Sequence, residues 1–177
     1  MNFRDSLISL INRQCLQTPR YGAEVGVHRG RTSVRLFHEF PRLHLYLVDS
    51  WTVAKEQTGD TLTRLSQEEQ DGFYAETCQL VSRYGDRAEI LRMDSVAATE
   101  FLQTLDFCFV DADHSRDGCA RDIRAYWKIV KHRGILCGHD YGKEDLPGVT
   151  IAVDDFAREV AADLNVEDGS IWWMRKL

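Results

Sequence analysis

The sequence lacks a hydrophobic run long enough to cross a membrane. No apolar stretch approaches the ~20 residues of a membrane-spanning helix. Arg4 and Asp5 stand near the start of the chain and no small-residue cleavage site follows them, so we expect no signal peptide. We therefore expect a protein without a membrane partner.

Positive charge is also scarce. The chain has 22 lysines and arginines against 28 acidic residues, which gives a formal net charge of −6. Because contacts between basic side chains and phosphates dominate nucleic-acid binding, this balance argues against a nucleic-acid partner.

Cysteine pairs with the C-x-x-C spacing of redox and zinc motifs are absent. The five cysteines are Cys15, Cys78, Cys108, Cys119 and Cys137. Two of them, Cys108 and Cys137, lie inside apolar runs typical of strands. This pattern favours buried free thiols in a reducing compartment, so we expect a cytoplasmic protein.

The sequence does contain a regular alternation of strand and helix patterns. Its 177 residues, 44% hydrophobic and 28% charged, suit one domain over 1–177, with an N-terminal helix within 1–18. Strand patterns lie at about 21–26, 43–48, 88–93, 105–110, 135–138, 163–167 and 171–175. Helix patterns lie at about 3–16, 31–39, 67–82, 96–103, 116–131 and 149–162. Five alternations predict an α/β fold, a parallel sheet with helices on both faces.

Three local signals refine this fold. The run LDFCFV at 105–110 is the most apolar strand, so it should be central and buried on both faces. Gly134 is a candidate residue for ending the preceding helix. The turn at 167–170 predicts a terminal hairpin, which adds one antiparallel strand.

Residues 21–30, YGAEVGVHRG, read as an apolar strand followed by a glycine-rich turn of the form E-x-G-x-x-x-G. Glycine lets a ligand approach the backbone, and a helix opening near Gly30 would direct its free N–H groups at that ligand. A second apolar strand ends at Asp49. In nucleotide-binding units, the carboxylate that binds the ribose diol follows the glycine turn by ~20 residues, and Asp49 has about this spacing. The pattern predicts a site for a nucleoside-containing cofactor.

Polar groups recur at the ends of successive strands. They are Glu24, Asp49, Asp94, Asp111 with Asp113, and His139 with Asp140. In a parallel sheet these ends share one edge, although turn chemistry also favours aspartate. The polar segment 51–66 follows the second strand; it reads equally as a lid over a substrate or as an ordinary connection.

The order of these motifs resembles that of class I S-adenosylmethionine-dependent methyltransferases. The stretch from VDADHS to GHDYG, residues 110–142, with GVTIAVDDF after it, is similar to the methyltransferase-24 type within that class. The resemblance covers nearly the whole chain. It implies a Rossmann-like, doubly wound sheet of seven strands in the order 3-2-1-4-5-7-6. One departure is Arg133-Gly134, which stands where the class usually has a glycine pair.

The resemblance also implies cofactor contacts at matching positions. Glu24 would lie near the methionine amino group, Asp49 would hold the ribose hydroxyls and Asp94 would accept from the adenine amine. The full set is Glu24, Gly26, Val27, His28, Gly30, Asp49, Ser50, Trp51, Asp94, Ser95 and Asp111. The competing interpretations are a strand-end cap for Asp49 and a helix cap for Asp94.

VDADH and GHDY are similar to motifs of metal-dependent catechol-type O-methyltransferases. The resemblance implies a divalent cation held by Asp111, His139 and Asp140, and a general base at His114, where those enzymes have lysine. Asp111 and His114 are thus the catalytic candidates. Two carboxylates with one imidazole suit Mn²⁺, Fe²⁺ or Zn²⁺ better than Mg²⁺. The alternatives are that no metal binds and that His114 makes only a loop hydrogen bond.

These observations favour an enzyme that moves a methyl group from S-adenosylmethionine to a hydroxyl of a small molecule. Alternatively, the chain is a cofactor-binding module without turnover. A nicotinamide-dependent oxidoreductase is disfavoured because Glu24 stands where its first glycine would be. The sequence does not identify the acceptor, and a homodimer is one possible assembly.

Overall fold

The computed structural model of the protein describes residues 2–53 and 65–177. Its strands form one sheet in the order β3-β2-β1-β4-β5-β7-β6. The strands are β1 (Tyr21–Val25), β2 (His44–Asp49), β3 (Ala88–Arg92), β4 (Leu105–Val110), β5 (Val130–Gly138), β6 (Asn165–Glu167) and β7 (Ile171–Arg175). The α-helices are α1 (Phe3–Gln14), α2 (Arg31–Glu39), α3 (Gln67–Val81), α4 (Ser95–Ala98), α5 (Arg116–Ile129) and α6 (Pro147–Glu159). The predicted fold class and strand order are confirmed.

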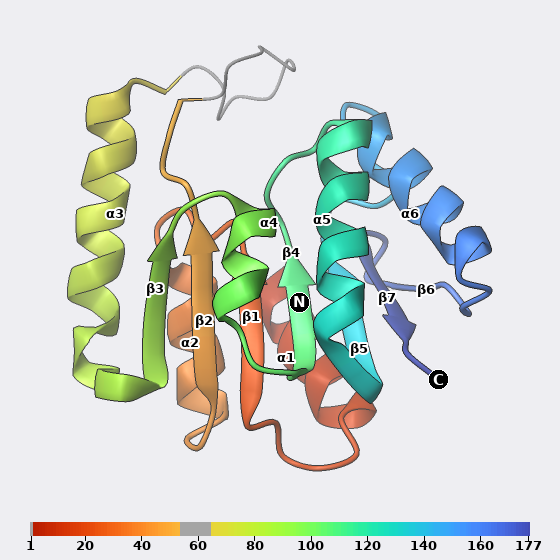
Figure 1. Cartoon of the computed structure of the whole chain (residues 1–177), viewed down its shortest axis with the longest axis horizontal. Coiled ribbons are helices and arrows are strands. Elements are labelled where there is room, and N and C mark those ends of the chain that lie inside the picture. The colour runs from red at the N-terminus through yellow and green to blue at the C-terminus, as the bar shows by residue number, and fades with distance from the viewer. Residues whose placement is uncertain (1, 54–64) are drawn as a thin grey trace.

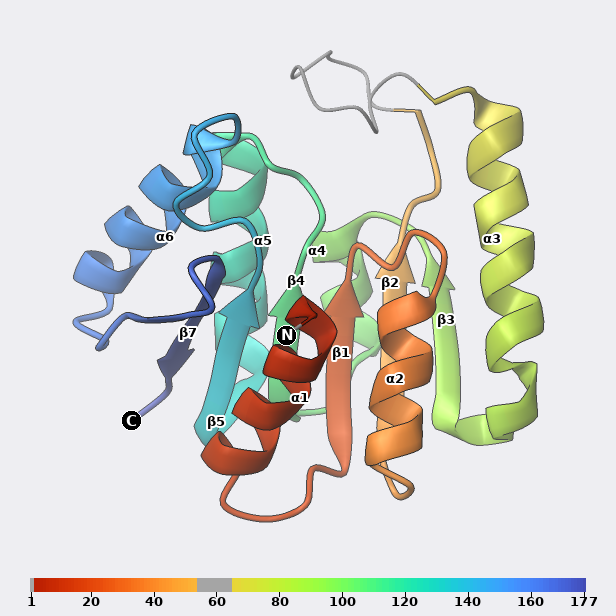
Figure 2. The same ribbon diagram turned by 180° about the vertical axis from the view of Figure 1, so that it is seen from behind.

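Helices cover both faces of the sheet. Helices α4, α5 and α6 lie on the face toward the viewer in Figure 1, and α1 and α2 lie on the other face, which Figure 2 shows from the front. Each face has its own apolar core, because the strands carry buried side chains on both sides. Within the described residues, no helix is long and apolar enough to cross a membrane.

The sheet gathers the strand ends that the sequence singled out. Strand β4 lies between β1 and β5, all three run parallel, and β2 and β3 continue in the same direction. Their carboxyl ends therefore share the upper edge of the sheet in Figure 1. We call this edge the carboxyl edge. Most of the predicted lid or connection at 51–66 lies outside the described residues, so its role stays a prediction.

The terminal hairpin returns the chain to the carboxyl edge. Its turn places Asp168 and Gly169 at φ values of 48° and 73°, the left-handed geometry of a tight hairpin turn. Strand β7 runs antiparallel to both β5 and β6, so β6 points the same way as β5. The residue after the turn, Ser170, consequently lies at the end of the sheet where β5 ends.

The prediction for the start of β5 was wrong. The strand begins at Val130, directly after α5, rather than at 135, and Gly134 lies inside it instead of ending a helix. The intervening residues 131–133 are polar and exposed, so they give no strand pattern in the sequence. The pairing with β4 is irregular here, and Arg133 takes a left-handed φ of 64°.

Candidate active site

The glycine turn after β1 packs against the loop after β4. Gly26 has a φ of 89°, and a Cβ placed on it would lie 2.1 Å from the backbone oxygen of Asp111. Only glycine fits this contact, which joins the predicted cofactor turn to the predicted catalytic loop. Gly30 then begins α2 in a left-handed conformation without a side-chain cap, so the first N–H groups of α2 have no capping side chain. This cradle suits the anionic end of a cofactor.

Asp49 orders the same turn from the neighbouring strand. One carboxylate oxygen accepts the backbone N–H of His28 at 2.9 Å, and the other accepts that of Trp51 at 2.8 Å. The strand-end cap is thus present. Because a carboxylate has about four acceptor sites, these two bonds leave capacity for a ribose diol. The residues present therefore fit a nucleoside cofactor.

Two residues predicted to contact the cofactor, Trp51 and Val27, have buried side chains. The Trp51 ring is fully buried, its Nε1–H donates to the His28 carbonyl at 2.8 Å, and it packs against Tyr74. Val27 is also buried. Both side chains therefore pack in the core, and contact of these residues with the cofactor stays a prediction. Ser50, between Asp49 and Trp51, is partly exposed.

Glu24 is a buried acid at the start of the glycine turn. Its side chain accepts the hydroxyl proton of Ser33, on α2, at 2.5 Å. Burial raises the pKa of Glu24 to about 8, and the nearby Asp111 adds to the shift. The carboxyl is therefore mostly protonated near neutral pH, and a cationic amino group beside it would favour its ionised form.

Asp94 caps a helix, as the competing interpretation holds. One oxygen accepts the backbone N–H groups of Val96 and Ala97, and the other lies 3.3 Å from the Arg121 guanidinium. Ser95 is anchored through its side chain, which donates to the buried Asp122 at 2.5 Å. Both residues lie after β3 at the carboxyl edge, so contact with adenine stays a prediction.

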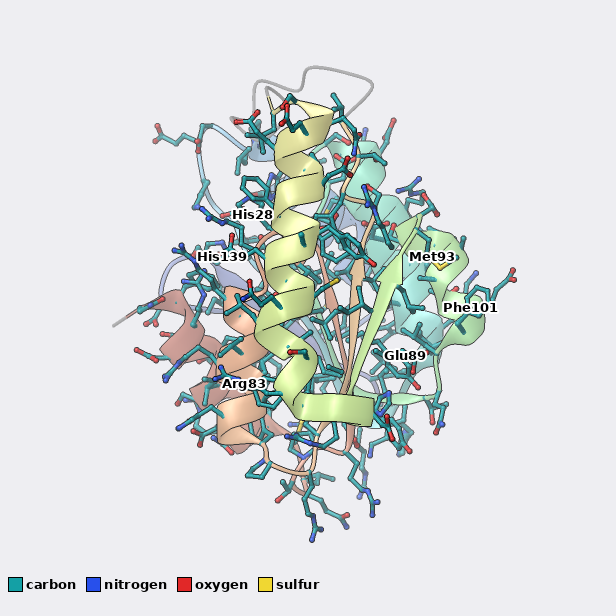
Figure 3. All side chains as sticks on the ribbon, turned by 90° about the vertical axis from the view of Figure 1, so that its left-hand side faces the viewer. His28, Arg83, Glu89, Met93, Phe101 and His139 are labelled. Atoms are coloured by element: carbon teal, nitrogen blue, oxygen red, sulfur yellow. The ribbon has the colours of Figure 1, made fainter. Side chains whose placement is uncertain are left out.

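The predicted catalytic residues converge around Asp140. Its Oδ2 lies 3.0 Å from Nε2 of His114, which is itself 3.7 Å from Asp111. Its Oδ1 lies 2.7 Å from Nδ1 of His139 and 2.5 Å from the ammonium of Lys143. We call these five residues the Asp140 cluster. In Figure 3, His139 and the glycine-turn residue His28 both lie toward the carboxyl end of the sheet.

Electrostatics hold Asp140 ionised. Its side chain is 6% exposed, and burial by itself raises the pKa of a carboxyl. Hydrogen bonds from His114, His139 and Lys143 outweigh burial and hold the pKa of Asp140 well below its usual range. Asp140 also has a left-handed φ of 65°, which turns its side chain back toward the two histidines.

The ligands predicted for a metal come together, but two of them, His139 and Asp140, already have close partners within the protein. One donor atom from each of Asp111, His139 and Asp140 lies within 4.8 Å of the others. Both ring nitrogens of His139 have protein partners, because Nδ1 meets Asp140 and Nε2 lies 3.1 Å from the Ser170 hydroxyl. The Lys143 ammonium contacts the same Asp140 oxygen as His139. The metal therefore stays a prediction.

Sequence reasoning missed four residues of the site. Ser33 and Lys143 are ordinary polar residues of a helix and a loop, with no motif of their own. Ser170 could have been found, because a hairpin whose first strand parallels β5 must turn at the carboxyl edge. Phe3 packs its ring 4.5 Å from that of His139. Nothing in the sequence signals that contact.

Comparison with known proteins agrees with this geometry. Residues 23–141 match a family model described as a methyltransferase domain, of the methyltransferase-24 type. The chain belongs to this family. S-adenosylmethionine is the cofactor expected for methyltransferase-24 proteins, and the matched residues include both the glycine turn and Asp140. A search of curated protein sequences gives no match.

Solved structures with the same fold include several methyltransferases. CalS11, a calicheamicin methyltransferase, superposes with a TM-score of 0.75 at 16% identity, over 98% of this chain and 79% of that one. A Staphylococcus aureus protein described as caffeoyl-CoA O-methyltransferase-like gives 0.73 at 13%, over 99% and 83%. An rRNA methylase from Streptococcus thermophilus gives 0.66 at 12%, over 97% and 95%. At these identities the likeness shows the fold that this methyltransferase-24 protein shares with them.

Proposed function

We propose that the protein transfers a methyl group from S-adenosylmethionine to a hydroxyl oxygen of a small molecule. The observation that carries this proposal is the contact between the two halves of the site. Gly26 packs against the backbone of Asp111, and Asp111 and Asp140 both lie near His114. A candidate base is thus within reach of the turn that would hold the methyl donor.

The chain's residues have distinct parts in this reaction. When bound, the cofactor supplies an electrophilic methyl group on a sulfonium. The imidazole of His114 would take the proton of the acceptor hydroxyl and so free its oxygen to receive that methyl group. Asp140 holds that imidazole in place and stabilises its cationic form, because the carboxylate is buried and ionised. The products are a methyl ether, S-adenosylhomocysteine and one proton.

The acceptor is proposed to be small and not a nucleic acid. The net charge of −6 supports this, since an RNA substrate would require a basic surface for its phosphates. An oxygen acceptor is proposed because an imidazole such as that of His114 can act as general base toward a weakly acidic hydroxyl. The competing function is a module that binds the cofactor without methyl transfer.

One experiment separates these functions. Purified protein is incubated with S-adenosylmethionine labelled on its methyl group and a panel of catechols, phenols, sugars and hydroxy acids, and labelled product is measured alongside S-adenosylhomocysteine. Equal amounts of both would support transfer to the acceptor. Tight S-adenosylhomocysteine binding by calorimetry without product from any acceptor would favour the binding module, and transfer to RNA but to no small molecule would refute the acceptor class.

A further inference from the structure

Lys143 occupies the Asp140 cluster from the loop that follows β5. Its backbone N–H faces the carbonyl of Asp140, which folds the side chain back over the turn. Its ammonium lies 2.5 Å from Oδ1 of Asp140. The Lys143 side chain is 43% exposed, whereas that of Asp140 is 6% exposed. The lysine therefore pairs a partly solvated ammonium with a buried carboxylate.

The charges of the cluster explain why a cation is required there. Asp111 and Asp140 are two carboxylates with oxygen atoms within 4.8 Å of each other. A buried carboxylate is costly without a partner of opposite charge. The ammonium supplies that partner, and Asp140 in turn raises the pKa of Lys143, with a smaller contribution from Asp111.

A divalent ion would need the position that the ammonium holds. Of the three candidate ligands, only Asp140 is nearly fully buried, and its Oδ1 already meets both Lys143 and the Nδ1 of His139. An ion bound to this oxygen would displace the ammonium or lie beside it. Two like unit charges ~4 Å apart near a protein surface repel each other strongly, and the double charge of a divalent ion doubles that repulsion.

We infer that Lys143 is the resident cation of the Asp140 cluster: it neutralises Asp140 in place of a divalent metal and keeps such a metal out. The inference rests on the proposed function only for its catalytic consequence. In that reaction Lys143 would be a positioning residue, because it holds Asp140 in the orientation that binds His114. A single tethered charge would also make the reaction independent of metal supply.

Metal binding tests the inference without any methyl acceptor. Mn²⁺ alone is titrated into the protein with S-adenosylhomocysteine present, and binding is followed by electron paramagnetic resonance and calorimetry. Wild-type protein should bind only weakly, with a dissociation constant of ~1 mM or above. Lys143→Met should bind at least ~10-fold more tightly, a change of ~1.4 kcal/mol. Lys143→Arg, which keeps the charge, should behave like the wild type.

Two further variants assign the effect to the cluster. Lys128→Met removes an exposed lysine from α5 and should leave Mn²⁺ binding unchanged. Adding Asp140→Asn to Lys143→Met should abolish the gained affinity. Micromolar Mn²⁺ binding by the wild type would overturn the inference, and so would Lys143→Met and Lys143→Gln both failing to gain affinity. None of these outcomes bears on whether methyl transfer occurs, so failure here is distinct from failure of the proposed function.

Discussion

The carboxylate of Asp49, the last residue of β2, accepts the backbone N–H of His28, in the turn after β1, at 2.9 Å. The same carboxylate accepts from Trp51, whose ring in turn donates to the His28 carbonyl. The two turns are therefore held by three hydrogen bonds that depend on one acid and one indole. A ligand bound to Asp49 would meet a turn that is already ordered.

We expect Asp49→Ala to weaken S-adenosylhomocysteine binding by ~1.5–3 kcal/mol, because charge-assisted hydrogen bonds to the ribose would be lost. Isothermal calorimetry measures the change. Asp86→Ala, at an exposed acid before β3, serves as the control and should leave affinity unchanged. Unchanged affinity in Asp49→Ala would reject the ribose assignment, and micromolar binding of NAD would favour an oxidoreductase.

The contact between Gly26 and the Asp111 backbone leads to a stability prediction. Gly26→Ala places a Cβ 2.1 Å from a backbone oxygen at a φ of 89°, so we expect destabilisation of ~1–3 kcal/mol or more and loss of S-adenosylhomocysteine binding. Gly72→Ala, in open space within α3, should instead stabilise by up to ~1 kcal/mol. Urea unfolding of both variants tests these two stability predictions. A neutral Gly26→Ala would refute the close packing of the two loops.

Glu24 makes stability depend on pH. Its pKa rises from 4.5 in the unfolded chain to about 8 in the native state, so between these values the native state holds the extra proton. The free energy of unfolding should therefore fall as pH rises through this window, by up to ~1.4 kcal/mol per pH unit from this group. Glu24→Gln should flatten the profile, whereas the exposed control Glu100→Gln should not. Urea unfolding near pH 6 and pH 8 measures the free energy of unfolding of the wild type and both variants. An equal change with pH in the wild type and Glu24→Gln would contradict the raised pKa of Glu24.

His114 carries the catalytic prediction. His114→Ala should lower turnover by ~10²–10⁴-fold, the range for a lost general base, and leave S-adenosylhomocysteine affinity nearly unchanged. The exposed His132 provides the control, because it lies near the start of β5, whereas the Asp140 cluster lies beyond the end of that strand. Wild-type protein should keep full activity after exhaustive chelation, since Lys143 supplies the cation. If His114→Ala also kept full activity, the assigned base would be wrong.

The fold was predictable because its signals are local and redundant. The run at 105–110 is apolar throughout, and its burial between β1 and β5 follows from that. The start of β5 was not predictable, because residues 131–133 are exposed and their strand pairing comes from tertiary contacts such as the Arg133 N–H to the Lys176 carbonyl. Hydrophobic periodicity indicates which side chains are buried, and the side chains of residues 131–133 are exposed.

The candidate site was predictable to the level of backbone position. Motifs placed Asp111, His114 and Asp140 at adjacent strand ends, and the fold brings them together. Side-chain direction was not predictable: Trp51 turns into the core, and Lys143 folds back onto Asp140. Both orientations depend on left-handed residues, Trp51 itself and Asp140, which no spacing rule identifies.

His139 contacts Phe3 from an early segment of the chain and Ser170 from a late one. The Gly26 turn and its Asp111 partner, in contrast, both precede it in the sequence. A chain growing on the ribosome therefore completes the cofactor turn before it can complete the hydrogen bonds of His139. Proteins rich in contacts between residues distant in sequence fold more slowly than those rich in local contacts. The residues of the Gly26–Asp111 contact are thus all synthesised before Ser170, the last partner of His139.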